Sequence, residues 1–83
     1  MDMTKEGLKP FSDEAKELMN GGIFEHYKKK RYKVIGIGRH TETLEEMVTY
    51  YDERGDLWIR PLKMFIELVT IDGEIVPRFK RID

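Results

Sequence analysis

Cysteine is absent from this 83-residue chain, and so is any long apolar run. Without cysteine there can be no disulfide framework and no thiolate metal site. No stretch approaches the roughly 18 apolar residues of a membrane-spanning helix, and no signal peptide is visible. We therefore expect a cytoplasmic protein with no membrane partner, stabilised by one apolar core. A domain of this length buries only about 60% of its unfolded surface, so that core is thin.

A net charge of one sign is also missing, although 37% of the residues are charged and the total is −1. Such a surface exerts no overall attraction on nucleic acid or membranes. The charges are nevertheless segregated, since basic residues dominate from Gly22 to His40 and acidic residues from Thr41 to Asp56. If these segments form neighbouring strands, their charges are expected to pair across the ladder.

One helix signal lies in the N-terminal part of the chain. Ser12 is a favourable N-cap, and acidic residues follow it in the first turn. The sequence Asn20-Gly21-Gly22 is typical of a helix stop. We predict a short helix from Asp13 to Met19, preceded by a loosely held arm over residues 1–9.

After Gly22 the pattern changes to short β-strands separated by turn residues. The predicted strands cover residues 23–27, 32–40, 46–52, 57–60, 66–71 and 74–79. Pro61 should end the fourth strand and begin a single helical turn. Asp72-Gly73 predicts a type I′ turn between the last two strands.

This order of elements is typical of an SH3-like barrel, because three hairpin-linked strands, a fourth strand and a helical turn precede the fifth strand. Closing the sheet would also remove exposed edges. We predict a mainly β protein: a small SH3-like barrel of five to six strands with one short N-terminal helix. Residues 1–21 would form the arm and helix, and residues 22–83 the barrel domain.

Several motifs occur in an order that is known from one protein family. They are the segments "YKVIGIGRHTETLEEMVTYYD", "LWIRPLKMF" and "DGEIVPRF". Together they resemble the bacterial family called domain of unknown function 1653, over roughly residues 22–79. The resemblance implies an SH3-type barrel, and it implies no established activity or catalytic residue.

Gly36 and Gly38 form the segment "GIG", which looks like the start of a phosphate-binding loop. Such loops need a further glycine and a helix immediately after a strand, and neither follows here. We interpret the two glycines as a bulge, a close approach of another group, or a bend that helps to close the barrel.

The two histidines do not form a metal site by their spacing. If His26 pairs with Lys33, then His40 lies roughly 23 Å further along the sheet, too far for one metal ion. No metal or cofactor is predicted. A small enzyme that uses His40 as a base, with Glu42 or Glu45 as its partner, remains an alternative that hydrogen-bond geometry must decide.

The hairpin from residue 50 to residue 60 carries the most informative side chains. If Arg54-Gly55 is a two-residue turn, Tyr51 faces Trp58 with Arg60 nearby, while Leu57 and Ile59 point into the core. An exposed aromatic pair beside an arginine is a platform for stacking a base or holding a cation. Alternatively, the N-terminal helix covers Trp58. A three-residue turn would shift the register by one and exchange the faces.

We therefore predict a non-catalytic binding or accessory module whose ligand is a peptide, a nucleotide or a small anion. The predicted ligand-binding residues are Arg39, His40, Tyr51, Trp58 and Arg60. An alternative is weak RNA or DNA binding through the basic turn formed by Lys28, Lys29, Lys30 and Arg31.

Overall fold

The computed structural model describes residues 8–83, so most of the predicted N-terminal arm lies outside the described residues. The described chain contains two short helices and seven strands. The helices are α1 (Asp13–Leu18) and α2 (Leu62–Phe65); the strands are β1 (Gly22–His26), β2 (Arg31–Arg39), β3 (Glu46–Tyr51), β4 (Leu57–Pro61), β5 (Leu68–Ile71), β6 (Glu74–Pro77) and β7 (Phe79–Arg81).

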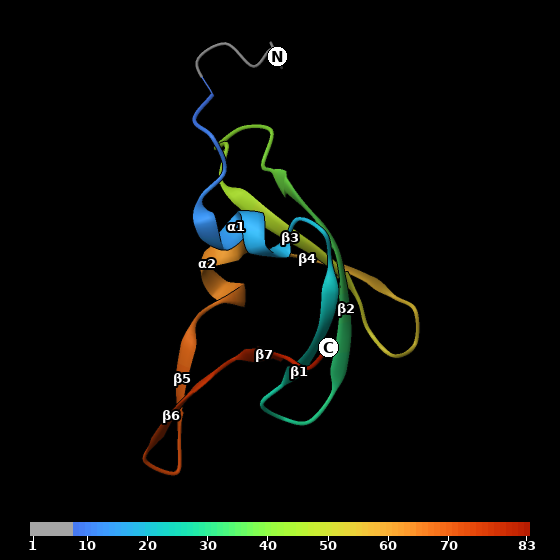
Figure 1. Ribbon diagram of the computed structural model, residues 1–83, viewed down its shortest axis with the longest axis vertical. Helices are drawn as coiled ribbons and strands as arrows, with labels where there is room; N and C mark the ends of the chain where they lie inside the picture. Colours follow the sequence, from blue (N-terminus) through green and yellow to red (C-terminus); the bar gives the residue numbers. More distant parts are fainter. Residues whose placement is uncertain (1–7) are drawn as a thin grey trace.

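The strands form a curved five-stranded sheet and a small separate hairpin (Figure 1). The large sheet has the order β4-β3-β2-β1-β7, and all its neighbours are antiparallel. The hairpin consists of β5 and β6. The predicted mainly β class is confirmed. The sheet is not closed into a barrel, because within residues 8–83 it ends at β4 on one side and β7 on the other.

The last predicted strand, residues 74–79, is divided between the two sheets. Pro77 ends β6, because proline has no N–H to continue the ladder. At Arg78 the chain crosses over: its N–H donates to the Glu67 carbonyl, and its carbonyl accepts from the Tyr27 N–H. β7 then pairs with β1, which places Phe79 opposite His26. This division explains why seven strands are present where six were expected.

The core lies between the concave face of the large sheet and the two helices, which lie side by side (Figure 1). Aromatic rings dominate it: Phe65 of α2 stacks on Phe79 at 4.2 Å between centroids, and Phe24 meets Phe65 edge-on at 5.3 Å. The buried residues are Ala15, Leu18, Phe24, Val34, Val48, Tyr50, Leu62, Phe65 and Phe79. Helix α1 therefore contributes two of the core side chains.

The predicted N-cap of the first helix is confirmed, although the helix ends one residue earlier than expected. The Ser12 hydroxyl accepts from the Ala15 N–H at 3.1 Å. The same residue is bound by Glu46 of β3, which accepts from the Ser12 N–H and from its hydroxyl, each at 2.7 Å. This double contact ties the start of α1 to the sheet.

The glycine-rich strand β2 contains a bulge, as one of the alternatives predicted. The pairing with β3 shifts between Val34 and Gly36, which leaves Ile35 as the extra residue. A Cβ atom added at Gly36 or Gly38 would meet nothing within 4 Å. The close approach offered as another reading of these glycines is therefore wrong.

The basic and acidic segments do form neighbouring strands, but their side chains do not make the expected ion pairs. The ion pairs found in residues 8–83 are Lys29–Glu25, Arg78–Glu67 and Arg81–Asp83. None of these joins the basic segment to the acidic one. In the described part of the chain, no helix is long and apolar enough to cross a membrane.

Candidate functional site

The register of the β3–β4 hairpin differs by one residue from the predicted register. Tyr50 lies opposite Trp58, and Tyr51 lies opposite Leu57. The reason is a three-residue turn: the Asp52 N–H donates to the Asp56 carbonyl, and Gly55 takes a φ of +87°. The predicted pairing of Tyr51 with Trp58 is wrong, and so is the predicted core position of Leu57 and Ile59, because a three-residue turn exchanges the two faces of β4 relative to β3.

A second register also differs from expectation. The first hairpin pairs Glu25 with Arg31, so the His26 N–H donates to the Lys30 carbonyl at 2.8 Å. The assumed pairing of His26 with Lys33 is wrong. The turn is tighter than expected, and Lys29 takes a φ of +76° within it.

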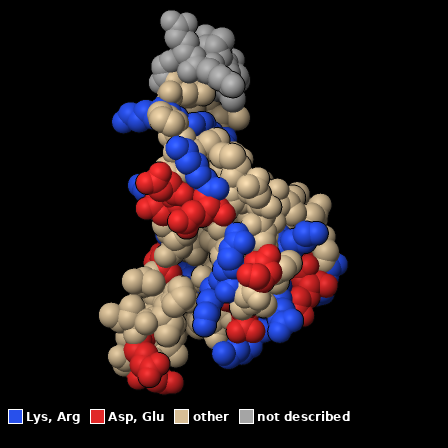
Figure 2. All heavy atoms as spheres, viewed as in Figure 1, with Lys and Arg blue, Asp and Glu red and all other residues tan. Residues whose placement is uncertain are grey.

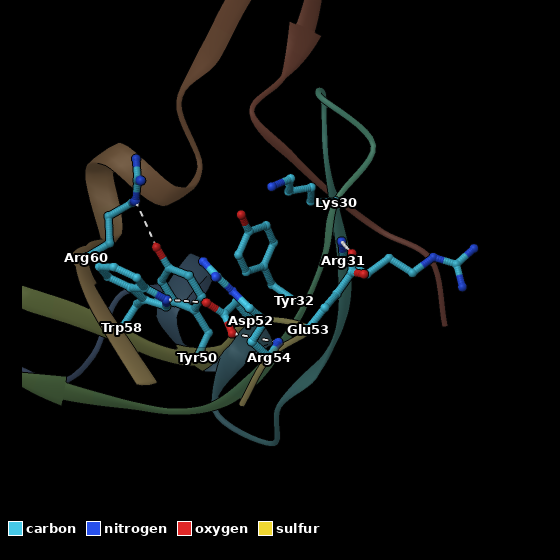
Figure 3. A pocket seen from close by; sticks show the side chains of 9 residues that line it. All are labelled: Lys30, Arg31, Tyr32, Tyr50, Asp52, Glu53, Arg54, Trp58 and Arg60. Carbon is cyan, nitrogen blue, oxygen red and sulfur yellow. Dashed lines mark hydrogen bonds between the residues drawn. The ribbon is translucent and has the colours of Figure 1, made fainter. Parts of the chain in front are cut away.

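With these registers, the side chains of three strands and two turns surround a hollow of about 450 Å³ (Figure 3). Tyr32 comes from β2, Tyr50 from β3 and Trp58 from β4. The complete lining is Lys30, Arg31, Tyr32, Tyr50, Asp52, Glu53, Arg54, Trp58 and Arg60. Four basic side chains and two acidic ones surround three aromatic rings.

Trp58 is held in place although it is 51% exposed. Its indole N–H donates to the Asp52 carboxylate at 2.8 Å. The other Asp52 oxygen accepts from the N–H groups of Arg54 and Asp56, so one carboxylate orders both the turn and the ring. The indole hydrogen bond and then the backbone donors hold the pKa of Asp52 below its usual value of 3.8. The alternative in which the N-terminal helix covers Trp58 is wrong, since this residue is 51% exposed.

Arg60 lies at the inner wall of the hollow. Its Nε donates to the Tyr50 hydroxyl at 3.1 Å, and its guanidinium carbon lies 5.6 Å from the centre of the Phe79 ring. The Tyr50 ring is itself buried. Within residues 8–83 the terminal guanidinium nitrogens of Arg60 make no hydrogen bond, so they can donate to a ligand.

Tyr32 and His26 adjoin this wall, and both are held in their neutral forms at neutral pH. Burial raises the pKa of the Tyr32 hydroxyl, and the neighbouring Tyr50 and Asp52 raise it further. Burial also lowers the pKa of His26, to which Arg78, Lys28 and Arg60 add their positive charges. The Tyr32 and Tyr50 rings meet edge-on, with centroids 5.5 Å apart. The neutral Tyr32 hydroxyl is thus a hydrogen-bond donor for the hollow.

The predicted basic turn is only partly separate from the hollow. Lys30 and Arg31 line it, whereas Lys29 pairs with Glu25 at 3.9 Å and Lys28 lies 5.9 Å from the Tyr27 ring. Basic and acidic side chains are interleaved on the lower part of the face drawn in Figure 2. No single strongly positive field covers that face.

Arg39 and His40 do not join the other predicted ligand-binding residues. The Arg39 guanidinium covers the Phe11 ring at 4.2 Å and donates to the Lys9 carbonyl at 2.6 Å. The His40 Nδ1 accepts from the N–H groups of Glu42 and Thr43, and so closes the turn after β2. In the described residues, no carboxylate is hydrogen-bonded to His40. Both side chains thus stabilise local structure at the end of β2 opposite the hollow.

Of the five predicted ligand-binding residues, the structure brings Trp58 and Arg60 together. Tyr51 lies on the opposite face of the same hairpin, and its ring is exposed. Sequence reasoning missed Tyr32, Tyr50 and Asp52. The segment "DERGD" carried the missing signal, because aspartate before a three-residue loop that ends in glycine favours a type I turn with a glycine bulge.

Chemically, the hollow combines flat aromatic surfaces with guanidinium and ammonium donors. No group of His, Asp and Glu that could hold a metal ion occurs in residues 8–83. Side chains of these types can stack on a planar group of a ligand and donate hydrogen bonds to an acidic group.

Fold and site together define a small mainly β domain with a side-chain-lined hollow. The family model described as "Protein of unknown function (DUF1653)" matches residues 22–81, so the chain belongs to this family. The expected family membership is thereby confirmed.

A solved structure supports the same assignment. The chain is similar to the crystal structure of a DUF1653 protein from Bordetella bronchiseptica, with a TM-score of 0.69 and 29% sequence identity. The match covers 75% of this chain and 85% of the other. A comparison with curated proteins gave no match.

Proposed function

We propose that the chain is a non-catalytic binding module whose hollow takes a small ligand with a planar ring and an acidic group, as in a nucleotide. The observation that supports this most directly is the half-exposed Trp58 ring, fixed by Asp52 at the wall of a hollow. An exposed ring that is already ordered loses little conformational entropy when a ligand stacks on it.

The charges around the ring favour an acidic ligand. Arg60 presents guanidinium N–H groups at the inner wall, and Lys30 and Arg54 add positive charge. Guanidinium groups match the geometry of phosphate and carboxylate oxygens. Asp52 is already engaged by three donors, so it adds less repulsion than its charge suggests.

The test is a titration of the protein with a mononucleotide, followed by Trp58 fluorescence and amide chemical shifts. We expect quenching of the indole and shifts at Tyr32 and Arg60. Trp58→Ala and Arg60→Gln should each weaken binding by about tenfold or more, because stacking or a charged hydrogen bond contributes roughly 1–3 kcal/mol. Tyr51→Ala is the matched control, since it removes an aromatic ring from the other face of the same hairpin.

A nucleoside without phosphate separates the two parts of the proposal. It should bind more weakly than the nucleotide, with the same fluorescence change. Chemical-shift changes confined to Arg39 and His40 would contradict ligand binding in the hollow. They would instead favour a site at the end of β2 that carries these two predicted residues. Equal binding by the Trp58→Ala variant would also contradict it.

A second candidate is weak binding of single-stranded RNA or DNA, with Lys28 to Arg31 holding the backbone. It is supported by the position of Lys30 and Arg31 at the hollow, next to the stacking ring. Binding of this kind weakens steeply as salt increases. An oligonucleotide that binds no better than a mononucleotide, or binds without salt dependence, would rule it out.

A further inference from the structure

Within residues 8–83 the strand β4 is an unpaired edge of the large sheet, and it carries consecutive exposed apolar side chains. Leu57, Trp58 and Ile59 are 51%, 51% and 63% exposed. The opposite edge, β7, instead exposes Lys80 and Arg81. Soluble proteins protect sheet edges with charge, and above all with lysine, to prevent pairing with another strand. Edge β7 has this protection, and β4 lacks it from residue 57 to residue 59.

The backbone of β4 is oriented for a further strand. The Asp52 N–H donates to the Asp56 carbonyl at 3.0 Å. Hydrogen-bonded pairs alternate along an antiparallel ladder, so Trp58 and Arg60 direct their backbone groups toward β3. The N–H and C=O groups of Leu57 and Ile59 therefore point to the free edge. Pro61, the next outward residue, has no N–H to donate, and as the N-cap of α2 it directs its carbonyl toward the helix.

We propose that β4 pairs with β4 of a second copy of this chain, antiparallel and centred on Ile59, so that the two large sheets become one. In this register the two Ile59 residues exchange both backbone hydrogen bonds. On either side of this pair, Pro61 adds no hydrogen bond between the copies, because it lacks an N–H and its carbonyl faces α2. The missing N–H of Pro61 limits the pairing to this short segment.

The side chains match this arrangement on both faces. On the outer face, Leu57, Ile59 and Pro61 of the two copies form one apolar strip. On the inner face, Trp58 of one copy lies opposite Arg60 of the other, which is a favourable cation–π neighbour. A strand that is complementary to itself in this way closes a two-fold dimer, and it does not propagate into a fibre.

The charges beyond the paired segment are complementary as well. An antiparallel pairing brings the β3–β4 turn of one copy to the beginning of α2 of the other. In this turn Asp52 holds the Trp58 ring and Glu53 accepts from the Arg31 N–H, which leaves the Asp56 carboxylate for Lys63, exposed on α2 of the other copy. One carboxylate therefore approaches one ammonium group at each end of the dimer. This match to a second copy is the reason for preferring it over an unrelated strand.

The dimer would extend the hollow, because each Trp58 would gain an Arg60 from the second copy beside it. The pairing itself does not depend on the proposed ligand. Its failure and the failure of ligand binding are therefore distinguishable.

The test is sedimentation velocity on the full chain over a wide range of concentration. We expect a reversible monomer–dimer equilibrium, which Ile59→Lys should weaken by about tenfold or more, because it places two ammonium groups directly opposite each other and removes apolar contact. Ile35→Lys is the matched control: Ile35 is 43% exposed but lies on the central strand β2. It should leave the equilibrium unchanged.

Amide hydrogen exchange supplies an independent reading. The N–H of Ile59 should gain protection as concentration rises, whereas those of Trp58 and Arg60 should be protected throughout. Protection at Trp58 also shows that Ile59→Lys folds; if it does not fold, Ile59→Thr keeps the β propensity and should weaken the dimer less. A chain that stays monomeric at all concentrations overturns the proposal. A dimer that is disrupted by Ile35→Lys and unaffected by Ile59→Lys also overturns it. The same holds for a monomer whose β4 binds only unrelated peptides.

Discussion

At the scale of single residues, the behaviour of the candidate site depends on Asp52. One of its oxygens orders the turn and the other orients the Trp58 ring, so a single carboxylate determines both the hairpin register and the stacking surface. Tyr50 has a comparable double role, because its ring belongs to the core while its hydroxyl accepts from Arg60. The hollow is thus built from residues that also stabilise the fold.

Acid should release the Trp58 ring. The pKa of Asp52 is lowered by its donors, so its contribution to stability is fully present above its usual value of 3.8 and is lost as the pH falls through the lowered pKa. We expect a change in Trp58 fluorescence and a fall in unfolding midpoint within this acid range. In Asp52→Asn the acid-dependent part should be smaller, and an unchanged pH profile would show that the indole contact does not form in solution.

A second residue-scale prediction concerns Ser12, which caps α1 and binds Glu46. Ser12→Ala removes the cap and one of the two hydrogen bonds that Glu46 accepts from Ser12, so we expect a loss of about 1–2 kcal/mol in unfolding free energy. Chemical denaturation measures this loss. Ser12→Thr keeps a hydroxyl and should cost much less, whereas equal losses would mean that the hydroxyl is not the stabilising group.

At the scale of elements, turns determine the architecture more than strand propensities do. The tight turns at Tyr27–Lys29 and Glu53–Gly55 set the two hairpin registers, and Pro77 divides the last predicted strand. The Asp72-Gly73 turn is as predicted: both residues have positive φ, and Ile71 pairs with Glu74. A one-residue change in a turn exchanges the faces of one strand relative to its partner, which is why the strands were predicted well and their cross-strand residue pairs were not.

Two glycines, Gly21 and Gly38, differ in how strongly the backbone requires glycine. At Gly21, where φ is +83°, an added Cβ would lie 2.6 Å from the Val34 carbonyl oxygen, so Gly21→Ala should destabilise the protein by more than about 1 kcal/mol. Gly38→Ala meets no neighbour and no positive φ, and it should be neutral or stabilising by up to about 1 kcal/mol. The midpoints of thermal unfolding of the two variants measure this difference. A lower midpoint for Gly38→Ala than for Gly21→Ala would contradict the structure.

At the scale of the whole molecule, the family match begins at residue 22, whereas the core includes side chains that precede this residue. Ala15 and Leu18 of α1 are buried against the sheet, and Ser12 is bound to β3. The N-terminal segment therefore completes a thin core from outside the family region. Whether residues 22–83 form an independent domain, as the sequence predicts, becomes a question of stability.

We expect a chain that starts at Gly22 to be strongly destabilised. Loss of the Leu18 side chain alone should cost about 2–5 kcal/mol, a large fraction of the stability of so small a domain. Urea unfolding of the shortened chain and of Leu18→Ala measures this. Met19→Ala, at an exposed position next to it, is the control. Unchanged stability of the shortened chain would confirm the predicted domain boundary at residue 22.

The sequence by itself determined the mainly β class, the Ser12 cap, the turn at Asp72-Gly73 and the family. These follow from local propensity, from turn chemistry and from motif order, all of which are properties of neighbouring residues. Only the tertiary structure decided which side chains meet: Tyr32, Tyr50 and Trp58 come from three strands whose facing side chains depend on the exact registers of two hairpins. The physical reason is the two-residue period of a strand, which turns a local uncertainty in one turn into a choice between core and surface.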